Sequence, residues 1–241
     1  MAAAANVQPD ETRIHLAGQW VFPLAQGALW WPDQQVLVVS DLHLEKGSSY
    51  ARRGQMLPPY DTGATLSVVE TLCAQLRPGR VISLGDSFHD RGAEVRLSEA
   101  DSARIQALTG AHDWVWVEGN HDPDPPQHLG GRATKTLEIG GLVFRHEPTG
   151  ERGEVAGHLH PAAKVRRKGR SVRKRCFVSD GERLVMPAMG AFTGGLNVHH
   201  PAVQAVFPNG FMAFALGDSR VYVFGLGQLS PDIAPQTHWR L

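Results

Sequence analysis

Three short, continuous apolar runs mark the first half of the chain, at residues 36–40, 80–84 and 114–118. Runs of this length without alternation predict strands that are buried on both faces. Between them, apolar residues at helical spacing predict helices over 62–76 and 98–108. The recurring order of strand, polar loop and helix indicates an α/β protein.

The second of these helices should begin after Ser98 as its N-cap and end near Gly110. Short apolar runs between Ile14 and Trp31 predict small antiparallel strands, and the second half of the chain is richer in strands. Gly140-Gly141 is typical of a hairpin between strands at 134–139 and 142–145. Further strands are predicted near 154–156, 172–178, 183–186, 204–207, 212–216 and 221–224. We expect residues 13–241 to form one domain behind a disordered start at 1–12.

Composition narrows the class of protein only slightly. Lys+Arg and Asp+Glu are equal at 24 each, so net charge indicates no particular partner. The two cysteines, Cys73 and Cys176, are expected to be buried thiols of a reducing compartment rather than a disulfide. No secretory signal and no apolar stretch long enough to span a bilayer is present, so we expect a cytoplasmic protein without a membrane partner.

Residues that bind metals occur in five short islands along the chain. Their donors are carboxylates, imidazoles and one amide, a set of oxygen and nitrogen ligands that suits manganese, iron or zinc. Two such ions close together form a clamp for phosphoryl chemistry. The islands are Asp41-Leu42-His43, Gly85-Asp86, Gly119-Asn120-His121-Asp122, His146 and Gly157-His158-Leu159-His160.

The islands fall where a sheet predicts a site. Asp41, Asp86 and Asn120 each follow one of the three buried runs, and sites of open α/β sheets lie beyond the carboxyl ends of the strands. Asp41 and His43 are two apart, so in an extended segment both project to the same side, and the two imidazoles of the last island follow the same logic. Asp86 is the candidate for a carboxylate that bridges two cations. Gly85 before it would permit a tight exit from the strand.

The third island also offers a candidate proton donor. Because His121 is adjacent to Asn120, it points elsewhere and need not be a ligand. It could hydrogen-bond a phosphate oxygen or protonate a leaving alkoxide. Asp122 would then fix the tautomer of His121 from behind.

Taken in order, the five islands resemble the calcineurin-like metallophosphoesterase superfamily. The resemblance implies a four-layer α/β/β/α sandwich with a central two-sheet β-sandwich. It also implies two metal sites that share Asp86. By this resemblance, the ligands of the first metal would be Asp41, His43, Asp86 and His160, and those of the second would be Asp86, Asn120, His146 and His158.

The sequence departs from the phosphoprotein phosphatases of this superfamily. They carry Gly-Asp-x-x-Asp-Arg-Gly, whereas residues 85–92 are one residue longer. The phosphate-binding arginine of those enzymes therefore does not transfer to Arg91, which weakens a protein-phosphatase interpretation.

A closer resemblance is to the ligase-associated DNA damage response endonucleases. It is carried by residues 41–47, 146–148, 157–162 and 187–197. This family implies manganese-dependent cleavage of DNA phosphodiesters, single-stranded DNA in particular. It also implies a functional association with a repair helicase and an ATP-dependent DNA ligase.

A basic run at 164–175 carries eight cations in twelve residues, directly after the last island. One interpretation is a solvated hairpin whose charges only confer solubility. The other is an arm that tracks DNA phosphates, with Arg52 and Arg53 on the opposite bank of the site. The candidate residues of the arm are Lys164, Arg166, Arg167, Arg173 and Arg175.

Three functions remain open at this stage. The first is a binuclear phosphodiesterase that acts on DNA. The second is a small-molecule or nucleotide phosphoesterase, which needs the metals but not the arm. The third is a non-catalytic scaffold for repair partners. Such scaffolds usually lose metal ligands, and none is missing here. The complete ligand set together with the basic run therefore favours the first function.

Overall fold

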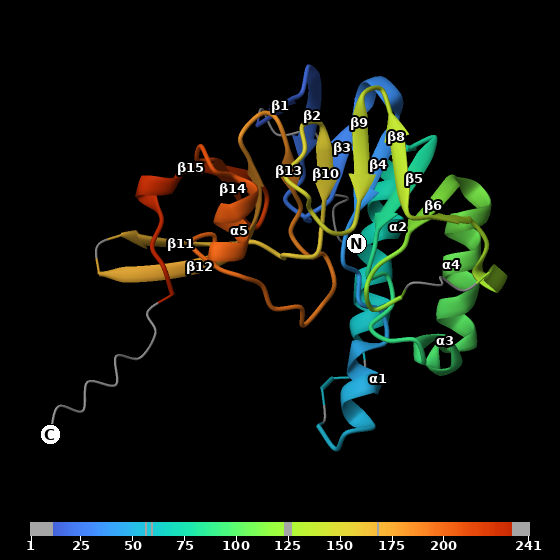
Figure 1. The fold of residues 1–241 in the computed structure, drawn as a ribbon. Coiled ribbons are helices and arrows are strands. Elements are labelled where there is room, and N and C mark those ends of the chain that lie inside the picture. Colours follow the sequence, from blue (N-terminus) through green and yellow to red (C-terminus); the bar gives the residue numbers. More distant parts are fainter. Residues whose placement is uncertain (1–11, 56, 59, 123–126, 168, 233–241) are drawn as a thin grey trace, which may run out of the picture.

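Two β-sheets pack face to face, with helices on the outer side of each (Figure 1). The computed structural model describes residues 12–55, 57–58, 60–122, 127–167 and 169–232, without the side chains of 127 and 167. The expected disordered start at 1–12 lies outside this range except for Thr12, whose hydroxyl is 3.4 Å from the carbonyl oxygen of Val221. The arrangement confirms the predicted fold class.

The first sheet has seven strands in the order β1-β2-β3-β4-β5-β6-β7. Neighbours up to β4 are antiparallel, and β4 to β7 run parallel. The strands are β1 (Ile14–Leu16), β2 (Gln19–Pro23), β3 (Leu29–Trp31), β4 (Val36–Val39), β5 (Arg80–Leu84), β6 (Asp113–Val117) and β7 (Arg132–Thr134). The helices of this half are α1 (Lys46–Ala51), α2 (Asp61–Leu76), α3 (Ala93–Arg96) and α4 (Glu99–Ala111), with 3-10 turns at Pro32–Gln34 and Gln127–Leu129.

The second sheet has eight strands in the order β15-β14-β12-β13-β10-β9-β8 with β11 paired to β12. It is mixed, because β9, β10 and β13 run parallel while the other pairs are antiparallel. The strands are β8 (Thr136–Ile139), β9 (Leu142–Arg145), β10 (Glu154–Ala156), β11 (Ala162–Arg167), β12 (Arg170–Ser179), β13 (Leu184–Val185), β14 (Met212–Leu216) and β15 (Val221–Gly225). Helix α5 (Pro201–Val206) and a 3-10 turn at Leu226–Gln228 complete this half.

Alternation along β4 shows how the layers are held. Leu37 and Val39 pack with α2 and α4, whereas Val36 and Val38 face the other sheet. A third apolar cluster joins the far face of the second sheet to α5. Three apolar interfaces between four layers explain why the three runs are apolar throughout rather than alternating, since both faces of each strand are buried.

Most of the predicted elements are confirmed within one or two residues. Helix α4 begins after Ser98, whose Oγ accepts from the backbone N–H of Asp101 at 3.0 Å. The strand predicted near 204–207 is wrong, because these residues belong to α5 or follow it directly. Pro201 at the first helical position and His200 as its cap start a helix there. A short apolar run cannot by itself distinguish the two structures.

Two further expectations can be compared with the described part of the chain. Cys73 and Cys176 are both free and buried, as predicted. Burial raises the pKa of the Cys73 thiol to about 12. Among the described residues, no helix combines the length and the apolar character needed to cross a membrane.

Candidate metal centre

The candidate ligands gather where strands of both sheets end. Asp41, Asp86 and Asn120 follow β4, β5 and β6, which are parallel in the first sheet. His146 follows β9 and the 157–160 loop follows β10, and these two strands are parallel in the second sheet. Each sheet therefore offers its ligands at the carboxyl ends of adjacent parallel strands, and the two edges meet.

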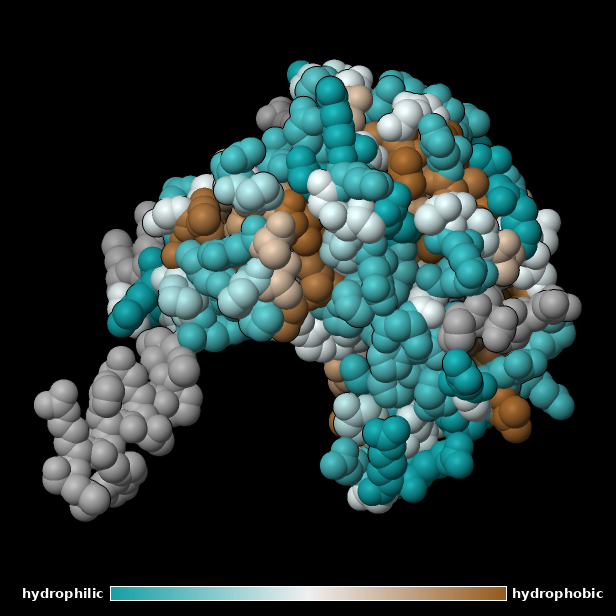
Figure 2. Space-filling view, viewed as in Figure 1, coloured by the Kyte–Doolittle hydropathy of each residue, from teal (hydrophilic) through white to brown (hydrophobic). Residues whose placement is uncertain are grey.

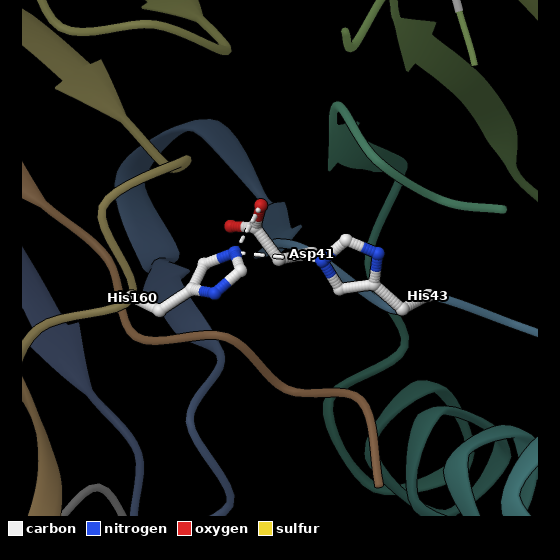
Figure 3. A group of neighbouring side chains, drawn as sticks. All are labelled: Asp41, His43 and His160. Carbon is white, nitrogen blue, oxygen red and sulfur yellow. Dashed lines mark hydrogen bonds and ion pairs between the residues drawn. The ribbon is translucent and has the colours of Figure 1, made fainter. Parts of the chain in front are cut away.

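One ligand group consists of Asp41, His43 and His160 (Figure 3). Nε2 of His160 lies 2.9 Å from Oδ1 of Asp41 and 3.5 Å from Nε2 of His43. Asp41 and His43 are buried and His160 is half-buried. The three ligand atoms lie within 4.8 Å of one another, close enough to bind one ion.

A second ligand group consists of Asp86, His146 and His158. Asn120 belongs with it, since its Oδ1 lies 2.9 Å from Nε2 of His146 and 3.0 Å from Nδ1 of His158. The two imidazole nitrogens are themselves 3.2 Å apart. Three donor atoms thus converge on one small volume.

Asp86 joins the two groups. Its Oδ2 lies 3.4 Å from Nε2 of His146 and 4.0 Å from Nε2 of His43. Its Oδ1 accepts from the backbone N–H of His121 at 2.9 Å, which fixes the carboxylate between the groups. This is the placement that a carboxylate shared by two cations requires.

The carboxylates remain ionised despite their burial. Burial raises the pKa of Asp86, but the hydrogen bond and charge of His146 and the N–H of His121 outweigh it and bring the pKa to about 2. Burial also opposes ionisation of Asp41, and the contacts with His160 and His146 still hold its pKa below the ordinary value. Desolvation lowers the pKa of His43 to about 3, so that imidazole is neutral, as a metal ligand must be.

These residues fit a pair of divalent cations. His146 shows it most clearly, because Asp86 and Asp41 overcome its burial and raise its pKa to about 9. A positive charge is therefore favoured at the point where Asn120, His146 and His158 meet. The donors are oxygen and nitrogen without sulfur, which suits metals of intermediate hardness.

The backbone at the ligands is strained. Five of the seven candidate ligands have positive φ angles, which L-residues avoid at a cost of about 1–2 kcal/mol each. The sequence analysis predicted that the two pairs of ligands two residues apart lie in extended segments. This prediction is wrong, because their φ angles are left-handed. They reach a common ion from left-handed loops instead. The five are Asp41 (51°), His43 (44°), Asp86 (46°), His158 (65°) and His160 (45°).

Two glycines make room for the shared carboxylate and its neighbour. Gly85 has φ 74°, and a Cβ there would collide with the ring of His146. A Cβ on Gly119 would collide with the backbone nitrogen and Oδ1 of Asp86. Gly85 thus provides the tight exit from β5 and also the space for a ligand of the other sheet.

His121 and Asp122 lie at the site but are not arranged as the sequence suggested. Nε2 of His121 is 4.0 Å from Oδ2 of Asp86, while its Nδ1 lies 3.0 Å from the carbonyl oxygen of His89. The carboxylate of Asp122 instead accepts from the backbone N–H groups of Ser87 and Phe88, at 2.8 and 3.1 Å. Asp122 therefore braces the loop after β5, and the His89 carbonyl takes the orienting position that we had expected of Asp122.

His89 is a site residue that the sequence argument missed. Its ring stacks on His121 with centroids 5.7 Å apart and meets His43 edge-on at 5.6 Å. Burial, Lys46 and His121 lower the pKa of His89 to about 4. Its place in the longer run after Gly85-Asp86 was the available signal.

The basic run forms the hairpin β11–β12, which projects from the body of the second sheet (Figure 1). Its register pairs Lys164 with Arg173 and Arg166 with Ser171, which places these cations on one face. Lys164 and Arg173 lie 3.8 and 3.2 Å from the carboxylate of Asp232. The side chain of Arg167 lies outside the described part of the structure.

The other candidate cations differ in exposure. Arg175 donates to the carbonyl oxygens of Ala188 and Met189 at 2.7 and 3.1 Å, and burial lowers its pKa. It therefore holds a neighbouring segment rather than facing solvent. Arg52 and Arg53 follow α1 and are exposed. Figure 2 shows the surface hollowed between the α1 side and the hairpin side.

Comparison with known proteins agrees with this geometry. The family model of calcineurin-like phosphoesterases matches residues 35–181. The chain belongs to this family. Its fold and the paired Asp/His groups mark it as a metallophosphoesterase, a hydrolase with two candidate metal sites.

Solved structures extend the comparison. The nuclease MPE of Pseudomonas putida is 27% identical, with a TM-score of 0.68 over 88% of this chain and 99% of that one. This match confirms the resemblance to the DNA damage response endonucleases. The phosphoesterase Yfce of E. coli is 16% identical, with a TM-score of 0.42 over 79% of this chain and 98% of that one. A search of curated proteins found no significant match.

Proposed function

We propose that this metallophosphoesterase is a manganese-dependent endonuclease that hydrolyses phosphodiester bonds of single-stranded DNA in DNA repair. The observation that carries the proposal is the sharing of Asp86 by two ligand groups beside a hairpin rich in cations. The similarity to the nuclease MPE supports DNA as the substrate.

Each ligand group would hold one cation, with Asp86 common to both. When bound, such a pair supplies an activated water and neutralises charge on the phosphoryl oxygens. With Asp86 shared, the ligands of the first cation would be Asp41, His43, Asp86 and His160, and those of the second would be Asp86, Asn120, His146 and His158.

His121 is the proposed proton donor. With Nδ1 bonded to the His89 carbonyl, Nε2 is left facing the centre. An imidazolium at this position donates its Nε2 proton to the leaving alkoxide of the DNA strand. Asp122 contributes indirectly, because it holds the loop that carries Asp86 and His89.

The hairpin would bind the DNA backbone. Arg166 is exposed, and Arg173 and Lys164 share its face. Arg52 and Arg53 would contact phosphates from the side of α1, and Arg167 is included because it belongs to the same basic run. For Arg175 we propose a positioning role, because its guanidinium is occupied by two carbonyls.

The central test is incubation with circular single-stranded DNA and a panel of divalent metals. Circles have no ends, so linear products establish endonucleolytic attack. We expect cleavage to be fastest with manganese and to stop on chelation. Absence of cleavage with every metal, alongside hydrolysis of a small phosphodiester, would assign the protein to the small-molecule phosphoesterases.

A charge-neutralising variant separates the hairpin from the metals. The double variant Lys164→Gln/Arg166→Gln should weaken DNA cleavage and make it less dependent on salt, because fewer counterions are released when DNA binds. Hydrolysis of methyl p-nitrophenyl phosphate should be unchanged. Arg152→Gln is the matched control, since this exposed arginine lies in the loop before β10 and pairs with Glu182 between β12 and β13. Equal effects on both substrates would contradict a DNA contact.

Two further parts of the proposal concern context. We propose a reducing cytoplasmic location, which the two buried free thiols support. The association with a repair helicase and an ATP-dependent ligase stays a prediction of the resemblance. A pull-down of the purified helicase and ligase with this protein, with and without DNA, tests the association.

A further inference from the structure

The segment 187–197 lies directly against both ligand-bearing loops. The N–H of Gly190 donates to the carbonyl of Asp41 at 3.1 Å, and a Cβ on Gly190 would collide with the carbonyl of Leu42. At the other end, a Cβ on Gly195 would collide with the carbonyl of His160. In Figure 3 this segment, drawn in orange, passes beside the three ligands of the first group.

The same segment also touches the basic hairpin. Arg173 donates from Nη2 to the carbonyl of Gly195 at 2.6 Å. On the opposite side, the N–H of Ala191 donates to Oγ1 of Thr65 on α2 at 3.2 Å. Residues 191–195 therefore link the metal centre to the hairpin, and a DNA strand that follows this segment from the ligands to the cationic face of β11–β12 would pass over them.

Phe192 stands in the middle of this path with a strained backbone. Its φ is 59°, a left-handed value that is an outlier for a bulky side chain. Its side chain is nevertheless 43% exposed, so burial in the core does not offset the strain. Strained residues of this kind concentrate at functional sites.

Trp20 and Tyr222, two aromatic residues of similar exposure, are covered in a way that Phe192 is not. Trp20 and Tyr222 are 42% and 43% exposed, and each carries an arginine over its ring, at 4.2 and 4.7 Å. Within the described residues, no other aromatic ring or cation stacks on Phe192. An open aromatic face beside a phosphodiesterase centre suits a nucleobase, because every base has a π-face to stack.

We infer that Phe192 is a base-stacking platform that holds an unpaired nucleobase of the substrate between the metal centre and the basic hairpin. This inference rests on the proposed DNA cleavage and deepens it. Stacking requires a base that is free of its duplex partner, so the platform selects single strands. Phe192 is a binding residue and takes no part in the chemistry.

The test compares a thymidine oligonucleotide with a strand of equal length built from abasic sites. Both carry the same phosphates, and only the first offers bases. Phe192→Ala should raise the KM for the thymidine strand roughly 5- to 100-fold, the loss of one base–aromatic stack. It should leave the KM for the abasic strand and both kcat values unchanged, and Phe192→Tyr should retain wild-type behaviour.

Two controls separate stacking from a structural effect. Phe192→Gly removes the ring while suiting the left-handed backbone, so it should keep thermal stability and show the same KM defect. Tyr222→Ala removes an equally exposed ring on β15 and should leave the KM for both strands unchanged.

Equal losses on the two strands, or none on either, would overturn the inference. If the wild type cleaves neither strand yet hydrolyses methyl p-nitrophenyl phosphate, the proposed DNA cleavage fails and the platform fails with it. Cleavage of both strands with no Phe192 effect removes only the platform.

Discussion

The two sheets supply the metal centre in different ways. The first gives Asp41, Asp86 and Asn120 from three successive parallel strands, of which β4 and β5 are followed in the chain by α-helices and β6 by a 3-10 turn. The second gives His146 and the 157–160 loop from two parallel strands inside a mostly antiparallel sheet. The first half places two of its ligands with a strand, a loop and a helix in succession, whereas the second half places its ligands without such a unit.

The difference lies in what holds the ligands. Carboxylates of the first half are fixed by backbone N–H groups, such as that of His121 on Asp86. Imidazoles of the second half are fixed by contact with the first, since His146 lies against Gly85 and the N–H of His158 points at Asp41. The two halves therefore hold each other's ligands, because the N–H of His158 also orients the carboxylate of Asp41.

The largest expected effect comes from the residue that both groups share. Asp86→Ala should lose both cations and lower turnover by on the order of 10³-fold, because it removes the carboxylate between them. His43→Ala and His158→Ala, one from each group, should each retain the cation of the other group. Metal content per chain and hydrolysis of a small phosphodiester measure both. An Asp86→Ala protein that keeps two ions and near-normal turnover would refute the shared role.

Adding a Cβ where the two halves touch should lower turnover nearly as much as Asp86→Ala. Gly85→Ala must adopt a left-handed φ, which costs about 1–2 kcal/mol, and it displaces the ring of His146. Gly195→Ala presses on the His160 carbonyl without a positive φ, so activity should fall more than stability. Denaturant unfolding and turnover measure the two effects.

Gly110→Ala serves as the reference for these glycines. It lies in α4 with open space around it and should raise stability by about 0.5–1 kcal/mol. If Gly85→Ala destabilised the protein no more than an ordinary surface substitution does, the predicted importance of the contact between Gly85 and His146 would be contradicted.

Helix caps offer a weaker comparison of the halves. Ser98→Ala removes the cap of α4 and should cost about 1 kcal/mol. His200→Ala removes the cap of the shorter α5, whose hydrogen bond to Ala202 is longer at 3.2 Å, and should cost less. Thermal unfolding compares them, and Ser98→Asn should restore stability. A larger loss for His200→Ala would reverse the ranking.

The smallest expected effect is the pH dependence of the ion pair between α2 and α4. Hydrogen bonds from Arg104 lower the pKa of Glu70, so its stabilisation is present above the pKa of the unfolded chain and lost as pH falls through the folded value. Because both groups are partly exposed, Glu70→Gln should cost less than about 1 kcal/mol at pH 7. The difference from wild type should vanish in acid. A constant difference from pH 7 to pH 3 would contradict this assignment.

The sequence was informative where local rules govern. Buried runs predicted β4, β5 and β6, and Ser98 predicted the start of α4. The short run at 204–207 was misleading, because its periodicity suits a helix as well as a strand, and the cap at His200 decided between them. The expected role of Asp122 also failed, since backbone N–H groups after β5 compete for its carboxylate.

The sequence alone determined which residues could bind metals and that they follow strands, because residue type and strand periodicity are local properties. Only the tertiary structure decided how they meet. The left-handed backbone at Asp41, His43 and His160, the fit of Gly85 against His146 and the open ring of Phe192 all depend on contacts between segments far apart in the chain. Such strain persists only where the surrounding fold compensates for it, and no local pattern encodes that compensation.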